Sequence, residues 1–243
     1  MPTRQFTEDR GEFETDPRWT AIDEYTTSHL HPPSRPNHAA ITHAIKNSAA
    51  KGLADIAAPS NIGKFLALQC QMLNAKHAIE FGTLGGCTAI WLTTMNPNLK
   101  ITTLEYEAST AEVARENIAN AGVSDRVDLI LGPAVDALPR LEQEIQSGQR
   151  EKLDFAFIDS DKMNNWTYFD WAVGMSRPGA CIVVDNVVSK GNLADAKAAE
   201  TNHMVKGAQM CVENVGKDDR VEAMVMQIVG EKDYDGFLMA VVK

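Results

Sequence analysis

Long apolar runs are missing from this chain of 243 residues. No stretch approaches the ~20 apolar residues that a membrane-spanning helix needs. The first 19 residues, MPTRQFTEDRGEFETDPRW, also lack the apolar core of a secretory signal. We therefore expect a soluble protein of the cytoplasm with no membrane partner.

Closely spaced cysteines are absent as well. Cys70, Cys87, Cys181 and Cys211 are far apart in the sequence and form no CxxC pair. Their spacing argues against a zinc site, and it is typical of a reducing compartment in which thiols stay free.

Positive charge is scarce, because 23 Lys and Arg face 33 Asp and Glu and the net charge is −10. An acidic surface repels phosphate backbones and anionic lipids, so we expect no nucleic-acid partner. The remaining composition, 44% hydrophobic and 23% charged, is that of an ordinary globular protein.

The first part of the chain predicts helices without strands. Residues 1–17 are polar and predict a mobile arm. Asp16 before Pro17 marks the start of a first helix, and Ser60 is expected to cap a third. The three prolines within residues 31–38 must end the first helix. The predicted helices cover residues 19–30, 37–51 and 60–74.

Short apolar runs alternate with helical patterns after residue 76. This alternation predicts βαβ units and a parallel sheet with helices on both faces. Gly122 and Gly179 fall where a helix should end or a strand begin. Two last apolar runs, 221–229 and 236–242, predict an antiparallel hairpin. The five expected parallel strands are 77–81, 100–105, 126–131, 153–159 and 180–185, with helices near 86–95, 108–121, 134–146 and 165–176.

A glycine-containing turn, EFGTLGG, follows the first predicted strand at residues 80–86. Its glycines allow backbone amides to approach a ligand, and the next helix begins with unpaired N–H groups. The dinucleotide fingerprint needs a second glycine for the pyrophosphate, but Leu84 stands there, which argues against NAD or FAD. Glu80 suits the cationic end of S-adenosylmethionine. A turn with glycines for geometry alone is the alternative.

Glu105 ends the second predicted strand. An acid at this depth commonly accepts hydrogen bonds from both ribose hydroxyls of a nucleotide cofactor. It does so in NAD proteins and methyltransferases alike, so Glu105 does not distinguish the two classes. A solvent-facing acid at a strand end is the alternative interpretation.

Two further acids end consecutive strands, Asp159 in FIDSDK and Asp185 in VVDN. Both should lie at the carboxyl edge of the sheet, with Asn186 beside them. Two carboxylates and an amide oxygen form a partial ligand shell for Mg²⁺ or a similar cation, although each acid alone could simply cap a helix. Lys162, three residues after Asp159, could accept a proton from a phenol, or it could be a solvated lysine near carboxylates.

These motifs together resemble the cation-dependent O-methyltransferases of the caffeoyl-CoA and catechol type. The resemblance covers about residues 56–243 and is carried by EFGTLGGCTAIWL, TLEYEASTAEVARENIANAGVSDRV, GPAVDALPRL, FIDSDKMNNW and DNVVSKG. It implies the class I methyltransferase variant of the Rossmann fold, with a seven-stranded sheet and N-terminal helices over the active site. It also implies a homodimer.

The resemblance also assigns residues to roles. Lys162 matches the proposed catalytic base. Positions matching S-adenosylmethionine contacts are Ala58, Glu80, Gly82, Thr83, Thr88, Glu105, Ala134 and Asp159. Positions matching ligands of a divalent metal, Mg²⁺ first and Ca²⁺ or Mn²⁺ as alternatives, are Asp159, Asp185 and Asn186. Asp161 and Lys190 match positions near the acceptor, which is expected to be a small, catechol-like molecule.

We divide the chain accordingly. Residues 1–55 form an arm and helices that should serve acceptor choice and dimer contacts, and residues 56–243 form the methyltransferase domain. Cys87 and Ile56 depart from the residues common in the family, but neither change removes a ligand. A non-catalytic protein that only binds S-adenosylmethionine, and a nicotinamide-dependent oxidoreductase, are the competing functions. The intact acid set argues against the first, and the absence of a Tyr-x-x-x-Lys pair argues against the second.

Overall fold

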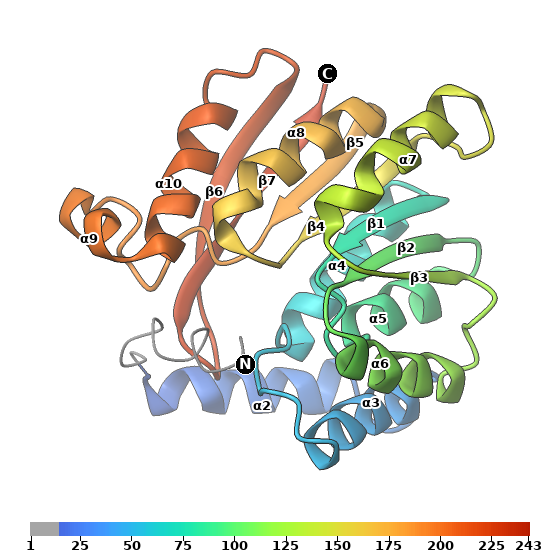
Figure 1. The fold of residues 1–243 in the computed structure, drawn as a ribbon. Coiled ribbons are helices and arrows are strands. Elements are labelled where there is room, and N and C mark those ends of the chain that lie inside the picture. Colours follow the sequence, from blue (N-terminus) through green and yellow to red (C-terminus); the bar gives the residue numbers. More distant parts are fainter. Residues whose placement is uncertain (1–14) are drawn as a thin grey trace.

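The computed structural model describes residues 15–243, so residues 1–14 of the predicted arm lie outside the described part (Figure 1). The helices are α2 Pro17–Leu30, α3 His38–Ala50, α4 Ser60–Met72, α5 Cys87–Met95, α6 Ala108–Asn120, α7 Ala134–Gln146, the short 3-10 helix η1 Lys162–Asn164, α8 Asn165–Met175, α9 Ala196–Thr201 and α10 His203–Val215. The strands are β1 His77–Phe81, β2 Lys100–Glu105, β3 Val127–Leu131, β4 Leu153–Ile158, β5 Ser176–Val184, β6 Val221–Val229 and β7 Tyr234–Val242.

One seven-stranded sheet runs through the molecule in the order β3-β2-β1-β4-β5-β7-β6. The first five strands pair in parallel, and β7 pairs antiparallel with both β5 and β6. The predicted parallel sheet with a C-terminal antiparallel hairpin is confirmed. The chain adds β2 and β3 on one side of β1 and then returns to place β4 on the other side. A ligand crevice is expected at this switch point, between β1 and β4.

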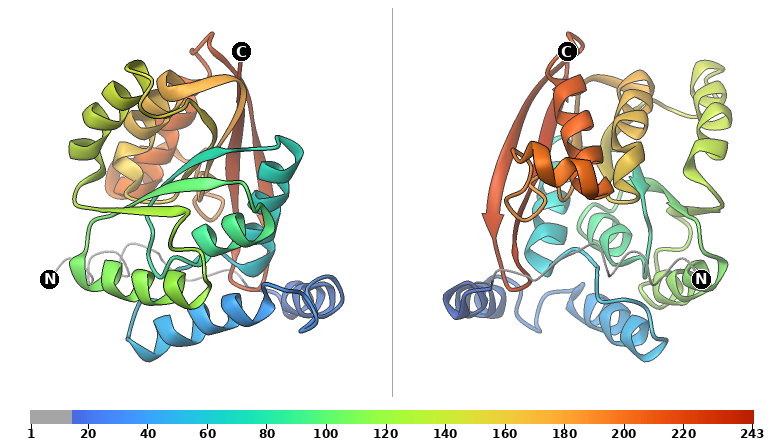
Figure 2. Two further views of the ribbon diagram at one scale, coloured as in Figure 1. Left: turned by 90° about the vertical axis from the view of Figure 1, so that its right-hand side faces the viewer. Right: turned by 60° about the vertical axis from the view of Figure 1, so that its left-hand side comes forward.

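Helices cover both faces of the sheet (Figure 2). On one face α7, α8 and α10 pack against a core that contains Leu138, Phe169 and Cys211. On the other face α3, α4, α5 and α6 pack against a core that contains Leu66 and Trp91. Because helices cover both faces, β1, β2 and β4 are buried at consecutive positions rather than at every second one.

The N-terminal helices begin close to their predicted positions. The Asp16 side chain accepts a hydrogen bond from the Arg18 backbone N–H (2.8 Å), and Pro17 is the first helical residue of α2, which therefore begins before Trp19. The predicted cap at Ser60 is wrong. Pro59 occupies the cap position of α4 and Ser60 is already helical, with no side-chain cap hydrogen bond.

Two regions differ from the sequence-based expectation. β5 begins at Ser176, and Gly179 lies inside it with φ +80°, where the pairing with β4 shifts register. The glycine permits the local bulge, so it does not start the strand. Helices α9 and α10 were not predicted. α10 buries Val205, Ala208 and Cys211 at helical spacing, and this pattern is the signal that could have revealed it.

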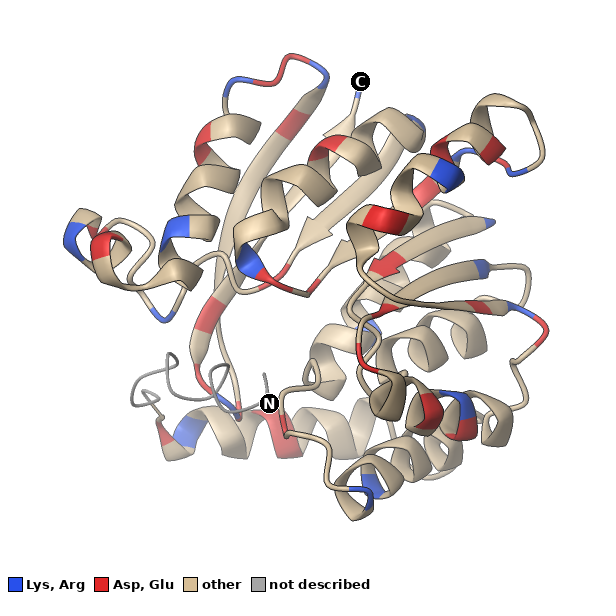
Figure 3. Ribbon diagram, in the orientation of Figure 1, with Lys and Arg blue, Asp and Glu red and all other residues tan. Residues whose placement is uncertain are grey.

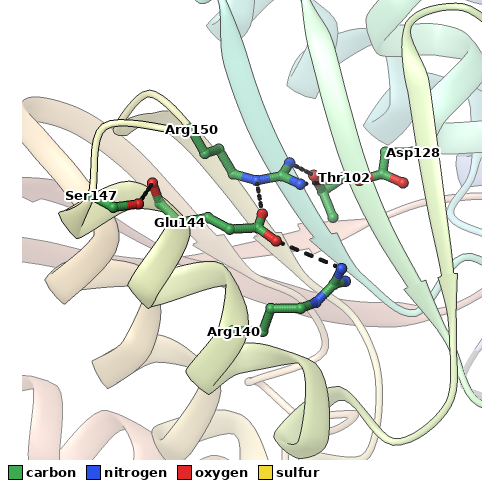
Figure 4. A network of polar contacts seen from close by, with 6 residues as sticks. All are labelled: Thr102, Asp128, Arg140, Glu144, Ser147 and Arg150. Atoms are coloured by element: carbon green, nitrogen blue, oxygen red, sulfur yellow. Dashed lines mark hydrogen bonds and ion pairs between the residues drawn. The ribbon is translucent and has the colours of Figure 1, made fainter.

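A polar network fixes the connection between α7 and β4 at the amino edge of the sheet (Figure 4). The Arg150 guanidinium donates to Glu144 Oε2 (2.9 Å) and Thr102 Oγ1 (2.6 Å) and pairs with Asp128 (3.2 Å). Arg140 approaches the other oxygen of Glu144 at 3.6 Å. These contacts connect α7, β2 and β3 at the edge of the sheet that carries none of the predicted site residues.

Charged residues of both signs are scattered over the elements, and no described helix or strand of residues 15–243 carries a continuous basic stripe in the view of Figure 3. Within residues 15–243, no helix is both long and apolar enough to cross a membrane.

Candidate active site

The carboxyl ends of four parallel strands lie level with one another. Phe81 of β1 is in register with Leu104 of β2 and with Ile158 of β4, and Ile158 is in register with Val184 of β5. The next residue of each strand therefore lies at the same edge. Backbone bonds continue this order, from the Asp159 N–H to the Phe81 carbonyl and from the Asp185 N–H to the Ile158 carbonyl (both 2.9 Å). The structure thus brings Gly82, Glu105, Asp159 and Asp185 to one edge, as predicted.

The turn after β1 has a backbone conformation that fits close approach. Gly82 has φ +95°, and a Cβ there would clash with the Asp159 carbonyl. Leu84 has φ +46°, a left-handed conformation that is strained for a branched residue, and its N–H donates to Glu105 Oε2 (2.8 Å). Strain of this kind gathers at ligand-binding sites. The turn rests on α3, because a Cβ at Gly85 would clash with Ser48 Oγ.

Glu80 is almost fully buried, with 1% of its surface exposed. Its Oε2 accepts a hydrogen bond from Thr103 Oγ1 (2.6 Å), which also contacts Thr83 Oγ1 (2.6 Å). Burial raises the pKa of the Glu80 carboxyl to about 8, and the hydrogen bond from Thr103 opposes this rise. A buried acid whose charged form is disfavoured is suited to pair with a cationic ligand group.

Glu105 is held by the backbone on both of its oxygens. Oε2 accepts from the Leu84 N–H (2.8 Å) and Oε1 accepts from the Glu107 N–H (2.9 Å). Burial raises the pKa of this carboxyl, and the backbone bonds lower it. Each carboxylate oxygen has a second lone pair, so Glu105 can still accept hydrogen bonds from two hydroxyls.

The remaining residues assigned to the cofactor lie in α5, in α7 and in the connection before α4. Thr88 is buried in the first turn of α5, and Ala134 is the first residue of α7. Gly132, just before α7, donates its N–H to the Glu105 carbonyl (2.8 Å), so α7 begins beside the end of β2. Ala58 lies in the connection that leads to α4, and it is partly exposed.

Lys162 lies directly beside Asp159. Its Nζ is 2.9 Å from Asp159 Oδ1, and the residue is 5% exposed. The residue begins η1, and α10 packs tightly on this turn, because a Cβ at Gly207 would clash with the Lys162 carbonyl. This packing holds the Lys162 backbone in place, with the side-chain nitrogen hydrogen-bonded to Asp159.

Asp185 is buried next to Asp159. Burial first, and the Asp159 charge second, raise the pKa of Asp185 well above its usual range, while Lys162 opposes the rise. Asn186 follows in the left-handed conformation, with φ +56°. In residues 15–243 no group of three or more His, Cys, Asp and Glu side chains is arranged to hold a metal ion. Two carboxylates with one amide form an all-oxygen set, and mutual repulsion of the two carboxylates is what a hard cation relieves.

Asp161 accepts hydrogen bonds from two residues that follow it in the chain. Its Oδ1 accepts from the Asn164 backbone N–H (3.2 Å) and side-chain amide (2.6 Å), and its Oδ2 accepts from the Tyr168 hydroxyl (2.6 Å). The carboxylate thus caps η1. A structural role was not part of the sequence-based expectation for this residue.

A hollow lies beside Asn186, between the loop after β5, the start of α10 and the C-terminal hairpin, and neither Asp159 nor Asp185 is part of its lining. Two residues that line this hollow, Asn186 and Lys190, are site residues predicted from the sequence. Asp235 was not predicted from the sequence. Its Oδ1 accepts from the Ser189 and Gly236 N–H groups (both 2.9 Å), and it therefore anchors the loop after β5. No motif marked Asp235, because its role depends on pairing of β7 with β5. The other lining residues are Ser189, Asn192, Asn202, Met204, Val205 and Asp233.

The strand order β3-β2-β1-β4-β5-β7-β6 with an antiparallel β7 is that of a class I, Rossmann-like methyltransferase, and the turn after β1 and the acid at the end of β2 are compatible with a nucleotide cofactor. The chain matches the O-methyltransferase family over residues 32–240 and belongs to that family. It is 52% identical to the O-methyltransferase imqG of Aspergillus flavus over 232 residues, which cover 96% of this chain and 94% of the relative.

Two more relatives support this assignment. The catechol O-methyltransferase of Mycobacterium tuberculosis is 41% identical over 206 residues, covering 84% of this chain and 89% of that protein. The crystal structure of an O-methyltransferase from Bacillus cereus in complex with SAH superimposes with a TM-score of 0.85 at 39% identity, covering 93% of this chain and 99% of that one. The chain is an S-adenosylmethionine-dependent O-methyltransferase, as predicted, and the two competing functions, an oxidoreductase and a non-catalytic protein, are set aside.

Proposed function

We propose that this enzyme transfers the methyl group of S-adenosylmethionine to one hydroxyl of a small catechol-like acceptor, and that a divalent cation holds and activates the acceptor. The observation that carries the proposal is the adjacent placement of Asp159, Lys162, Asp185 and Asn186 at the crevice edge of the sheet. The catechol O-methyltransferase of Mycobacterium tuberculosis, at 41% identity, supports the acceptor class.

The cofactor would lie across the ends of β1 and β2. Glu80 would pair with the methionine ammonium group, since a cation beside it relieves the cost of ionising a buried acid. Glu105 would accept the ribose hydroxyls. Asp159 would border the cofactor as well as the cation. The Ala58 backbone would meet the methionine end of the cofactor. The other proposed contacts are Gly82, Thr83, Thr88 and Ala134.

Asp159, Asp185 and Asn186 would hold the cation, Mg²⁺ by ligand type and Ca²⁺ or Mn²⁺ as alternatives. Bound there, the cation supplies a lowered pKa for the acceptor hydroxyl and a fixed pose for two vicinal oxygens. Lys162 would take the hydroxyl proton at Nζ, and Asp159, at 2.9 Å, would keep that nitrogen oriented. The remaining rate acceleration would come from holding the acceptor oxygen against the methyl carbon, because an in-line displacement requires this geometry.

The composition of the hollow favours a free catechol over a coenzyme A ester. Among its lining residues Lys190 is the only basic one, whereas Asp233 and Asp235 are acidic. A diphosphate would meet repulsion there and would lack paired cations. Lys190 and Asp161 remain our proposed residues near the acceptor, Asp161 acting through the η1 turn that it caps.

Residues 1–55 are proposed to shape acceptor choice, and residues 56–243 to form the catalytic domain. We further propose a cytoplasmic homodimer. Four free cysteines support a reducing compartment, and the exposed Met224 and Met226 on the edge strand β6 support a contact between copies. Light scattering of the purified protein tests the dimer.

The test of the proposed function compares Asp185→Asn with wild type. Turnover of catechol should fall by at least a hundredfold, while the dissociation constant of S-adenosylmethionine changes little, since Asp185 is assigned to the metal alone. Asp128→Asn is the matched control, because Asp128 is a paired carboxylate at the opposite edge of the sheet. Equal turnover in Asp185→Asn and the control would remove the metal site from the mechanism.

A further inference from the structure

The tip of the C-terminal hairpin lies against the N-terminal part of the chain. The strands β6 and β7 extend beyond the rest of the sheet as far as α2 (Figure 1), and both views of Figure 2 show the same approach. The Glu231 N–H donates to Asp23 Oδ2 of α2 (2.7 Å), and Asp23 Oδ1 accepts from the Asn61 amide of α4 (2.7 Å). The hairpin loop, residues 230–233, is therefore bonded to α2, and through Asp23 it is connected to α4.

Lys232 extends this attachment to the segment that contains Ala58. Its Nζ donates to the Ala57 carbonyl (3.0 Å) and pairs with Asp55 Oδ1 (2.7 Å). The two contacts of Lys232 differ in strength. The Asp55 side chain is 94% exposed, so solvent screens that ion pair, whereas the carbonyl bond is charge-assisted and the Lys232 side chain is only 29% exposed.

The charge of Lys232 also acts at the start of α5. Burial raises the pKa of the Cys87 thiol to about 12, the Glu80 charge adds to this rise, and Lys232 opposes it. Cys87 is the first residue of α5 and follows the glycine turn. Lys232 thus lies near Cys87 at the start of α5, while its Nζ contacts the segment 55–58.

We propose that Lys232 is a positioning residue that fastens the segment 55–58 over the methionine end of the cofactor, so that the hairpin loop controls cofactor retention. The proposal rests on the placement of the cofactor given above. It adds a residue that belongs to none of the family motifs and that acts through the Ala57 carbonyl rather than by touching the reacting atoms. A segment fastened over the cofactor in this way, which we call the strap, must open for S-adenosylhomocysteine to leave.

The test uses the full chain with Lys232→Ala, with Lys232→Arg as the conservative variant and Lys51→Ala as the matched control. Lys51 forms a surface ion pair with Glu116 of comparable length (2.9 Å), but it joins α3 to α6. Two readouts are needed: the dissociation constant of S-adenosylhomocysteine, and hydrogen exchange of the 53–59 backbone without ligand. Lys232→Ala should raise the dissociation constant about tenfold, as expected for a lost charge-assisted bond, and should speed exchange in 53–59.

The two readouts separate the possible roles. Lys232→Arg should recover most of both properties, Asp55→Asn should change each only slightly, and Lys51→Ala should change neither. Weaker binding with unchanged exchange would mean direct contact with the cofactor and would overturn the strap. Faster exchange with unchanged binding would mean that the strap does not serve the cofactor, which also overturns it. Failure to methylate catechol would contradict the proposed acceptor without affecting either readout.

Discussion

Lys162 Nζ lies 2.9 Å from Asp159 Oδ1, three residues earlier in the chain, at the carboxyl edge of the sheet. The same carboxylate is assigned to the cation and to the orientation of the lysine. The geometry thus places our proposed proton acceptor and one of our proposed metal ligands within one hydrogen bond of each other.

Lys162→Ala tests this arrangement. A general base contributes about 10²–10⁴-fold, so turnover should fall by that order with acceptor binding little changed. Raising the pH, or using a catechol with a more acidic hydroxyl, should recover part of the loss, because such an acceptor ionises unaided. The check is the pH–rate profile with two acceptors. A uniform loss across pH and acceptors would instead make Lys162 a group that only positions the acceptor.

Glu105→Ala should weaken S-adenosylmethionine binding by about 1.5–3 kcal/mol through lost bonds to the ribose. It should also lower stability, because the Leu84 and Glu107 N–H groups lose their acceptor. This second effect was not expected from the sequence, which showed only an acid at a strand end. Calorimetric titration and thermal unfolding measure the two effects, with Glu105→Gln retaining one acceptor oxygen. An unchanged dissociation constant would mean that the ribose lies elsewhere.

The buried acid Glu80 should make stability depend on pH in an unusual direction. Its pKa rises from 4.5 to about 8 on burial, so the folded chain prefers the neutral form. Without ligand, ionising Glu80 therefore destabilises the fold, and stability should decline as pH rises from about 4.5 to 8 and then level off, an effect on the order of a few kcal/mol. Denaturant unfolding across this range should show that slope in wild type, and Glu80→Gln should reduce it.

The same group should release a proton when the cofactor binds. At pH 7 Glu80 is largely neutral in the free protein, and pairing with the methionine ammonium favours its charged form. Calorimetry in two buffers of different ionisation enthalpy should show release of up to one proton per S-adenosylmethionine. Wild type and Glu80→Gln giving the same proton count would show that Glu80 does not pair with the cofactor.

Much of the fold was predictable, because β1 and β2 are short segments, rich in branched and apolar residues, between clear breaks. The observed bounds, His77–Phe81 and Lys100–Glu105, are the predicted ones. Strand-end acids could be placed together because the carboxyl ends of parallel strands share one edge. For the site, the sequence predicts the edge of the sheet on which a side chain lies. It does not predict the hydrogen-bond partners of that side chain.

Contacts between distant parts of the chain could not be predicted. Lys232 and Ala57 are 175 residues apart, and Glu231 and Asp23 are 208 apart, and nothing in either local sequence marks the other. The left-handed backbone of Leu84 could not be predicted either. It is imposed by the hydrogen bond to Glu105 and by the packing of the turn, although leucine rarely adopts this conformation.

The most direct test of the account is methyl transfer from S-adenosylmethionine to catechol before and after removal of divalent metal. The metal-free enzyme should still bind S-adenosylmethionine but lose nearly all turnover, and added Mg²⁺ should restore it, because Asp159, Asp185 and Asn186 are proposed to hold the cation. Full turnover in excess chelator, with no metal retained by mass spectrometry, would contradict the account.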